Sequence, residues 1–146
     1  MATRAEGRTP AHVWIVGLIA LLWNAYGCFE YLMMVTANAD YMAKIPPEQL
    51  AYMDTLPSWL TAFWALGVWG GLLGAMLLLM RSRYSVWAFA LSFVGAVVGM
   101  CYQTFVATMP ASMTAGMMAY MPYLIIALAA FLLWYAWTEE KKGVLK

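Results

Sequence analysis

Residues 59–107 read WLTAFWALGVWGGLLGAMLLLM-RSR-YSVWAFALSFVGAVVGMCYQTFVA, two long apolar runs separated by Arg81-Ser82-Arg83. A helix needs about 20 residues to cross a hydrocarbon core, and residues 59–80 and 84–107 are both long enough. Neither run alternates apolar with polar residues, which excludes barrel strands and favours helices that satisfy their own backbone hydrogen bonds. Because the connection is so short, these two helices form an antiparallel hairpin.

Two further apolar runs flank this hairpin, at residues 13–37 and 117–137. The sequence therefore predicts an all-α integral membrane four-helix bundle formed by a single domain, residues 1–146. At 146 residues and 65% hydrophobic, the chain has no room for a separate soluble domain. Only 10% of its residues are charged, too few for a surface that binds nucleic acid.

The basic residues are distributed unequally between the two sides of this pattern. Seven of the eight lie on one side: Arg4, Arg8, Arg81, Arg83, Lys141, Lys142 and Lys146. Lys44 alone lies on the other. By the positive-inside rule both termini are cytoplasmic, and loops 38–57 and 108–116 face outward.

The first span also resembles a secretory signal, since Arg4 and Arg8 precede it and Ala37-Asn38-Ala39 could be cleaved. However, the apolar run is much longer than the roughly 7–15 residues of a signal peptide's apolar region. It also contains Glu30. We therefore expect the first helix to be retained.

The first outer loop contains a start signal for a short helix, because prolines at 46–47 are followed by Glu48. We expect an amphipathic helix through about Thr55, with Leu50, Met53 and Leu56 forming its apolar stripe. It would lie on the membrane surface or cap the bundle.

Glycines at four-residue spacing occur in the second and third spans and would let two helix backbones approach closely. They are Gly67, Gly70, Gly71 and Gly74 in the second span, and Gly95 and Gly99 in the third. They could form a dimer interface, but packing of the second span against the third within one bundle is favoured.

Glu30 is the first candidate for a functional residue. It lies about 9 Å outside the centre of the first span, near Asn24, where a carboxylate costs on the order of a few kcal/mol. No Lys or Arg lies within any span, and His12 is too distant to reach it in one protomer. Glu30 is therefore either a proton, cation or polar-ligand site, or a carboxyl near the interface that is bonded to tyrosine.

Other polar and aromatic residues at a similar depth could complete a ligand-binding pocket around Glu30. They are Tyr26, Trp23, Asn24, Tyr102, Gln103, Tyr120 and Tyr123. For Asn24, an interhelical packing role is favoured over a ligand contact.

Sulfur-containing residues allow two weaker interpretations. Met113, Met117 and Met121 recur every four residues on the outer side and could bind Cu(I), although methionine is also common in flexible apolar packing. Cys28 and Cys101 could form a disulfide if their Cα atoms lie within about 7 Å, but two small residues in packed helices are favoured.

Catalytic motifs are missing from the sequence. It has no CxxC, HExxH or phosphate-binding loop, and its single histidine cannot form a cluster. We therefore expect a protein that is not an enzyme, and no cofactor is implied.

A resemblance supports the topology. The runs 22–31, Tyr41-Met42, 47–50, Pro57-Ser58-Trp59 and 68–71 resemble a family of small four-helix bacterial membrane proteins, mostly uncharacterised and sometimes labelled "sugar transporter". It covers roughly residues 13–83 well and the rest loosely. It implies a Gram-negative inner membrane and assigns no functional residue.

Three functions follow as hypotheses. The first is binding or translocation of a small polar solute at an outward-facing pocket around Glu30, with proton coupling through Glu30; transport would require a homo-oligomer. The second is an accessory subunit of a larger membrane complex. The third is Cu(I) handling by the outer methionines. In each case the lipid bilayer is the main surrounding, and other membrane subunits are possible partners.

Overall fold

The structure is a computed structural model that describes residues 8–146, so Arg4 and its predicted charge contribution lie outside the described residues. Every regular element in this range is helical. The elements are α1 (Ala11–Val35), α2 (Ala39–Met42), α3 (Pro47–Asp54), α4 (Ser58–Leu79), α5 (Ser85–Phe105), α6 (Ala111–Thr114), the 3-10 helix η1 (Gly116–Ala119) and α7 (Met121–Lys141).

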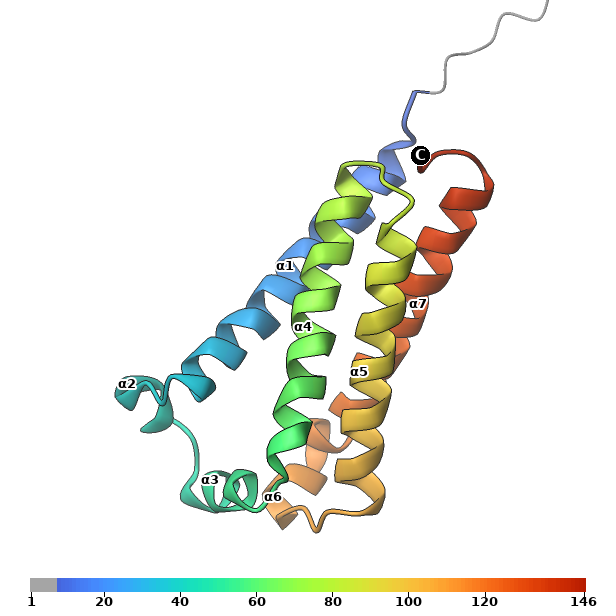
Figure 1. The fold of residues 1–146 in the computed structure, drawn as a ribbon. Coiled ribbons are helices and arrows are strands. Elements are labelled where there is room, and N and C mark those ends of the chain that lie inside the picture. The colour runs from blue at the N-terminus through green and yellow to red at the C-terminus, as the bar shows by residue number, and fades with distance from the viewer. Residues whose placement is uncertain (1–7) are drawn as a thin grey trace, which may run out of the picture.

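Within residues 8–146, four helices are long and apolar enough to cross a membrane: α1, α4, α5 and α7 (Figure 1). This confirms the expectation of an all-helical chain with four membrane-length helices. The first three begin and end within two residues of the predicted limits.

The fourth helix begins at Met121, one turn later than the predicted residue 117. The chain is extended at Ala115 and Gly116 has a φ of 62°, which separates α6 from the turn η1. Glycine suits this left-handed conformation. At its other end α7 continues past the predicted residue 137 to Lys141, because backbone hydrogen bonds do not stop where the apolar run does.

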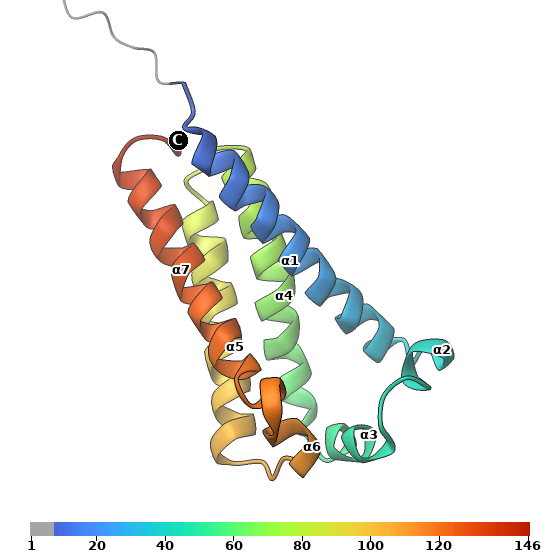
Figure 2. The same cartoon turned by 180° about the vertical axis from the view of Figure 1, so that it is seen from behind.

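The long helices pack in sequence order: α1 against α4, α4 against α5, and α5 against α7. Figures 1 and 2, which view the molecule from opposite sides, both show the start of α1 beside the C-terminus at one end of the bundle. Both also show α1 diverging from the other helices toward α2. The bundle is therefore closed at one end and spread at the other.

The α4–α5 contact depends on small residues. A Cβ atom added to Gly95 would lie 2.6 Å from the carbonyl oxygen of Phe63 and 2.8 Å from the nitrogen of Gly67. The Ser92 hydroxyl donates a hydrogen bond to the Gly67 carbonyl oxygen at 2.6 Å. These glycines pack α4 and α5 within one chain, as the sequence favoured. Gly71 instead contacts Asn24 of α1.

The apolar core lies at the closed end, where Val13, Leu78, Phe89 and Ala136 are almost completely buried. The last residues of the chain close this end further. The Arg83 amide donates to the Lys146 carbonyl at 3.0 Å, and the Lys146 amide donates to the Arg81 carbonyl at 2.8 Å.

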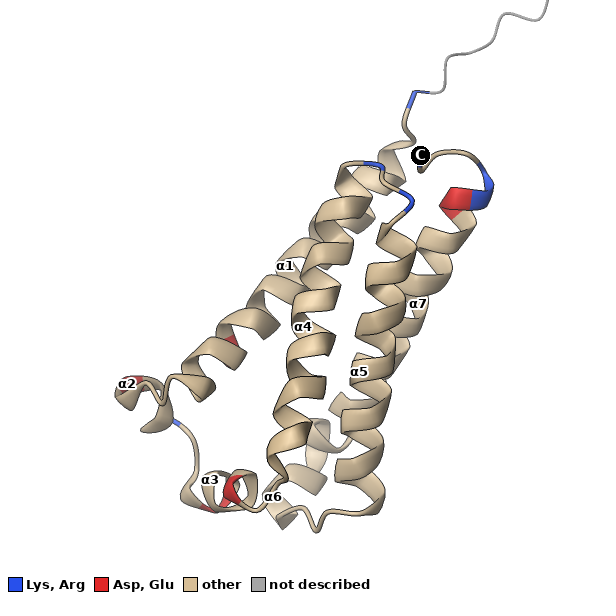
Figure 3. Ribbon diagram, viewed as in Figure 1, with Lys and Arg blue, Asp and Glu red and all other residues tan. Residues whose placement is uncertain are grey.

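Charge is divided between the two ends of the bundle (Figure 3). Among residues 8–146, six of the seven basic residues lie at the closed end, together with Glu139 and Glu140. The spread end carries Glu30, Asp40, Glu48 and Asp54 against Lys44. The asymmetry seen in the sequence is thus an asymmetry of the folded molecule.

Candidate functional site

Glu30 lies on α1, five residues before the helix ends at Val35, and its side chain is half-buried. The hydroxyl of Tyr41 donates to Glu30 Oε1 at 3.4 Å. Tyr41 reaches this position because the chain reverses after α1: Ala37 takes a φ of 50°, and the Asn38 side chain accepts the Tyr41 amide at 3.0 Å as the N-cap of α2. This local turn brings a second tyrosine to the carboxylate.

Two further aromatic residues, Phe29 and Tyr26, lie near this contact. Phe29 and Tyr41 pack edge to face with ring centroids 6.2 Å apart, and Tyr26 lies one turn before Glu30 on the same face of α1. Burial raises the pKa of the Tyr41 hydroxyl, and the charge of Glu30 raises it further. Tyr41 therefore remains a neutral donor at ordinary pH. The bond from a tyrosine agrees with the second interpretation of Glu30 offered by the sequence.

Most of the other predicted pocket residues lie elsewhere. Tyr102 packs edge to face against Trp59 at 5.2 Å, and it lies near Tyr52 rather than Glu30. Tyr120 and Tyr123 are 72% and 65% exposed. Among residues 8–146, no hydrogen bond joins Glu30 to any of these side chains or to Gln103.

The reason lies in the arrangement of the helices. Matching depth predicts convergence only if the four helices stay close together, and α1 instead diverges toward its C-terminal end (Figure 1), which lies five residues after Glu30. Helical geometry also places Glu30 about 120° around α1 from Asn24, which is on the buried face against α4. The structure therefore brings together Glu30, Tyr26 and Tyr41, a smaller cluster than predicted.

Asn24 and Trp23 have separate surroundings. The Asn24 amide donates to the Ala20 carbonyl of its own helix at 2.8 Å, and its side chain fills the space left by Gly71. Asn24 thus serves packing, as favoured, but its hydrogen bond lies within α1 and not between helices. Trp23 lines an apolar groove between α1 and α7, away from the carboxylate.

The methionines predicted as copper ligands lie on three different elements. Met113 is in α6, Met117 is in η1 and is 84% exposed, and Met121 is the first residue of α7. Four-residue spacing aligns side chains only on one continuous helix, and the break at Ala115 and Gly116 removes that alignment. Cu(I) binding stays a prediction.

Both cysteines are free thiols. Cys28 is buried and donates to the Val68 carbonyl at 3.3 Å across the α1–α4 contact, whereas Cys101 is exposed on α5. Cys28 therefore has the packing role that the sequence favoured.

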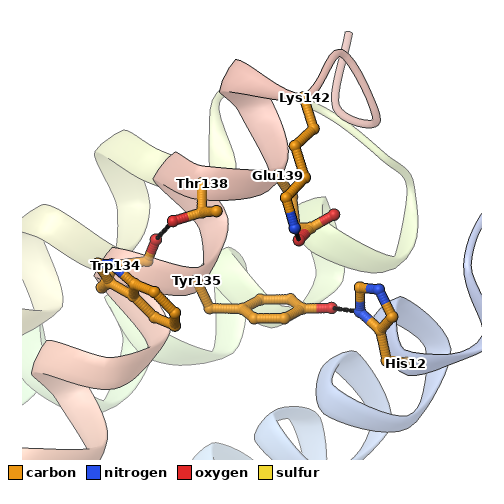
Figure 4. Close-up of polar contacts among 6 residues, drawn as sticks. All are labelled: His12, Trp134, Tyr135, Thr138, Glu139 and Lys142. Atoms are coloured by element: carbon orange, nitrogen blue, oxygen red, sulfur yellow. Dashed lines mark hydrogen bonds and ion pairs between the residues drawn. The ribbon is translucent and has the colours of Figure 1, made fainter.

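A second polar cluster, which the sequence did not indicate, lies at the closed end (Figure 4). His12 Nδ1 is 2.5 Å from the Tyr135 hydroxyl, which joins the first turn of α1 to α7. One turn after Tyr135, Glu139 is 1% exposed and pairs with Lys142 at 3.0 Å. Its other oxygen, Oε2, is buried and has no partner in the described structure.

This cluster could have been found from topology. With four membrane-length helices, the first helix starts at the end of the bundle where the fourth helix finishes, so His12 near the start of α1 and Tyr135 near the end of α7 lie at a similar level. Tyr135 is 7% exposed, so its ring is buried in the bundle and only its hydroxyl is left to pair with His12. Residues 8–146 contain no group of three or more His, Cys, Asp or Glu side chains that could hold a metal.

Comparison with models of known protein families, with curated proteins and with solved structures finds no match to this chain. A proposal for the binding site therefore depends on the geometry of the chain itself. In chemical terms, the Glu30 cluster offers one carboxylate, phenolic hydroxyls and aromatic ring faces, which suit binding of a cation or a hydrogen-bond donor.

Proposed function

We propose that this chain is a multi-pass membrane protein that binds a small, positively charged polar solute at Glu30, Tyr26 and Tyr41. One observation carries the proposal. Glu30 is half-buried in a membrane-length helix, and its one hydrogen-bond partner in residues 8–146 is a neutral phenol. The one salt bridge among these residues is Lys142–Glu139, at the other end of the molecule. A carboxylate in this setting favours a cationic ligand.

The aromatic rings suggest the chemical class of that cation. Tyr26 is 62% exposed and Phe29 is 49% exposed, so both present accessible π surface next to the carboxylate. Aromatic rings beside a negative charge attract organic ammonium groups through cation–π interactions. A small amine therefore fits the cluster better than an uncharged sugar.

We further propose the bacterial inner membrane, with both termini in the cytoplasm. The concentration of basic residues at the closed end supports this orientation through the positive-inside rule. The resemblance to small bacterial inner-membrane proteins supports the compartment. The Glu30 cluster would then face the periplasm.

Passage of a polar solute through one protomer has no support in the described helices. The groove between α1 and α7 has a volume of about 170 Å³ and is lined only by apolar side chains. They are Val16, Ile19, Ala20, Trp23, Leu128, Phe131 and Leu132. Proton-coupled transport would therefore require a polar pathway between several copies of the chain.

The test is a binding titration of small ammonium compounds into the protein in detergent. Tryptophan fluorescence reports the binding. We expect saturable binding of at least one primary or quaternary amine, and a loss of about tenfold or more in Glu30→Gln, because the charge is removed at constant shape. Glu48→Gln is the matched control, since Glu48 is an exposed carboxylate in α3 at the same end. Equal binding by wild type and Glu30→Gln would disprove the proposal.

A second function has one specific observation in its favour. Glu30 lies about 120° from the α4-packed face of α1, on the helix that diverges from the bundle. A neighbouring subunit could cover this region and donate to the carboxylate, as an accessory subunit of a larger complex would require. Native mass spectrometry after gentle extraction tests this, because other polypeptides bound in fixed ratio would favour the accessory role.

A further inference from the structure

A groove larger than the one beside α1 lies between α5 and α7, near the closed end. Its volume is about 390 Å³, and its lining is Val86, Phe93, Ala130, Leu133, Trp134 and Trp137. Each helix contributes residues over a span of seven positions, so the groove runs about 10 Å along the bundle. It is open along its side, which in a bilayer is toward lipid.

Two basic residues lie near the end of this groove: Arg83 in the connection just before α5, and Lys141 at the last position of α7. Arg83 precedes Val86 by three residues, and its guanidinium lies 5.7 Å from the centroid of the Tyr84 ring. Lys141 follows Trp137 by one turn, and its Nζ atom lies 3.5 Å from the centroid of the Trp137 ring. An apolar groove therefore ends between two exposed cations.

Carboxylates near this position must also be considered. Glu139 is buried and paired with Lys142, so it does not reach the groove's end as a free charge. Glu140 is partly exposed and lies seven residues after Leu133, which places it on the same side of α7. The three groups Arg83, Lys141 and Glu140 leave a net charge of +1.

We propose that this groove binds one phospholipid with an anionic headgroup, its acyl chain along the groove and its phosphate between Arg83 and Lys141. Basic pockets between membrane helices recognise anionic headgroups, and the charge on both sides of the groove supplies that complementarity. Trp134 and Trp137 suit the level where the chain meets the headgroup. A protein helix docked in the groove would contact its apolar surface, but an apolar helix would leave Arg83 and Lys141 without an anionic partner.

Native mass spectrometry in detergent tests this lipid site directly. The probes are phosphatidylglycerol and phosphatidylcholine with identical acyl chains. We expect wild type to bind one phosphatidylglycerol more tightly than phosphatidylcholine. Arg83→Gln and Lys141→Gln should each weaken phosphatidylglycerol binding about fivefold and leave phosphatidylcholine unchanged.

Two controls separate a built site from general attraction to a basic surface. Arg8→Gln removes the same charge from the closed end but beside α1, so it should leave binding unchanged. Glu140→Gln should tighten phosphatidylglycerol binding severalfold, because it removes the nearby negative charge. Ala130→Leu narrows the groove without changing charge and should weaken both lipids; its helix content and melting temperature would show that it folds.

Several outcomes would overturn the proposal. Equal affinity for the two lipids would show ordinary surrounding lipid, and an equal effect of Arg8→Gln would show unlocalised electrostatics. Competition by millimolar inorganic phosphate with no effect of Ala130→Leu would show a phosphate site without a lipid chain. A homodimer that excludes lipid would show that a second copy covers the groove.

Discussion

The hydroxyl of Tyr52 is expected to destabilise the folded state. It is 5% exposed, and its hydroxyl is buried without a hydrogen-bond partner in the described structure. An unpaired buried hydroxyl costs free energy that its removal recovers. We therefore expect Tyr52→Phe to leave the free energy of unfolding unchanged at pH 7, or to raise it by up to about 1 kcal/mol. Denaturation in detergent followed by circular dichroism measures this.

The same residue predicts an alkaline effect. Burial raises the pKa of Tyr52 above 10.0, and nearby Tyr102 raises it further. The folded state thus holds this proton more tightly than the unfolded state. This tighter proton binding by Tyr52 contributes to the free energy of unfolding. The contribution is fully present below pH 10 and is lost as the pH rises from 10 toward the raised pKa. Tyr52→Phe should therefore lose less stability than wild type between pH 9 and about 11, and parallel curves would contradict this.

Glu139 and Lys142 form a coupled pair at the closed end. Glu139 is 1% exposed, so removal of its partner leaves a buried charge uncompensated. Since the Lys142 side chain is 57% exposed, we expect Lys142→Gln to cost about 1–2 kcal/mol, below the value for a fully buried pair. Adding Glu139→Gln should recover most of that loss. Strictly additive effects of the two changes would show that the pair is not coupled.

For single residues, the sequence predicted which side chains are unusual but not which side chains they contact. Glu30 stands out because a carboxylate is rare in an apolar run. Its partner Tyr41 depends on the left-handed turn at Ala37, and alanine gives no sequence signal for that conformation. His12 and Tyr135 likewise meet through the packing of distant segments.

Helix contacts make a sharp prediction for two glycines on α5. A Cβ at Gly95 would collide with backbone atoms of α4, whereas none would lie within 4 Å of a Cβ at Gly99. We expect Gly95→Ala to cost about 2–4 kcal/mol through separation of α4 and α5. Gly99→Ala is the matched control, and it should be neutral or slightly stabilising because alanine favours helix. Thermal denaturation in detergent compares them.

The same contacts decide how bulky substitutions at Gly71 and Gly95 should be interpreted. Gly71 and Gly95 contact α1 and α4 of the same chain, so bulky residues there would disturb the fold before any assembly. A loss of oligomers in such variants would not identify an interface. Equal stability of the Gly95 and Gly99 variants would contradict the close contact described here.

The elements themselves were largely predictable because length and hydropathy determine them. The limits of α1, α4 and α5 follow directly from apolar runs bounded by polar or proline residues. The predicted start of the fourth helix, residue 117, was wrong because residues 116–119 form the 3-10 turn η1 before α7 begins at Met121, and composition does not distinguish such an apolar turn from the first turn of an α-helix.

For the whole molecule, the charge distribution predicts topology. A fluorescent protein that matures only in the cytoplasm should be bright when fused after Lys146, and also bright when fused before α1. A periplasmic phosphatase fused within the α2–α3 loop should be active. Opposite signals from the two ends of the chain would contradict the placement of both at one end of the bundle.

The divergence of α1 could not be predicted from sequence. Helices in a membrane are apolar around their whole circumference, so hydrophobic periodicity does not reveal which face packs or how closely. Gly17, Asn24 and Cys28 are buried on the α4 side, but the open angle of the helix depends on the entire arrangement. This is why the pocket predicted from depth alone was larger than the cluster observed.

That open angle gives the molecule a wedge-shaped profile, wider at the end that carries α2 and α3 than at the closed end. In a bilayer the wide end would occupy more area in its leaflet than the closed end in the other. Swinging α1 toward α4 would reduce the area occupied in the wider leaflet and leave the other nearly unchanged. Lateral pressure does work on any such change in area. Stretching of the bilayer should therefore favour the wide arrangement of α1 around Glu30 over any arrangement in which α1 lies against α4.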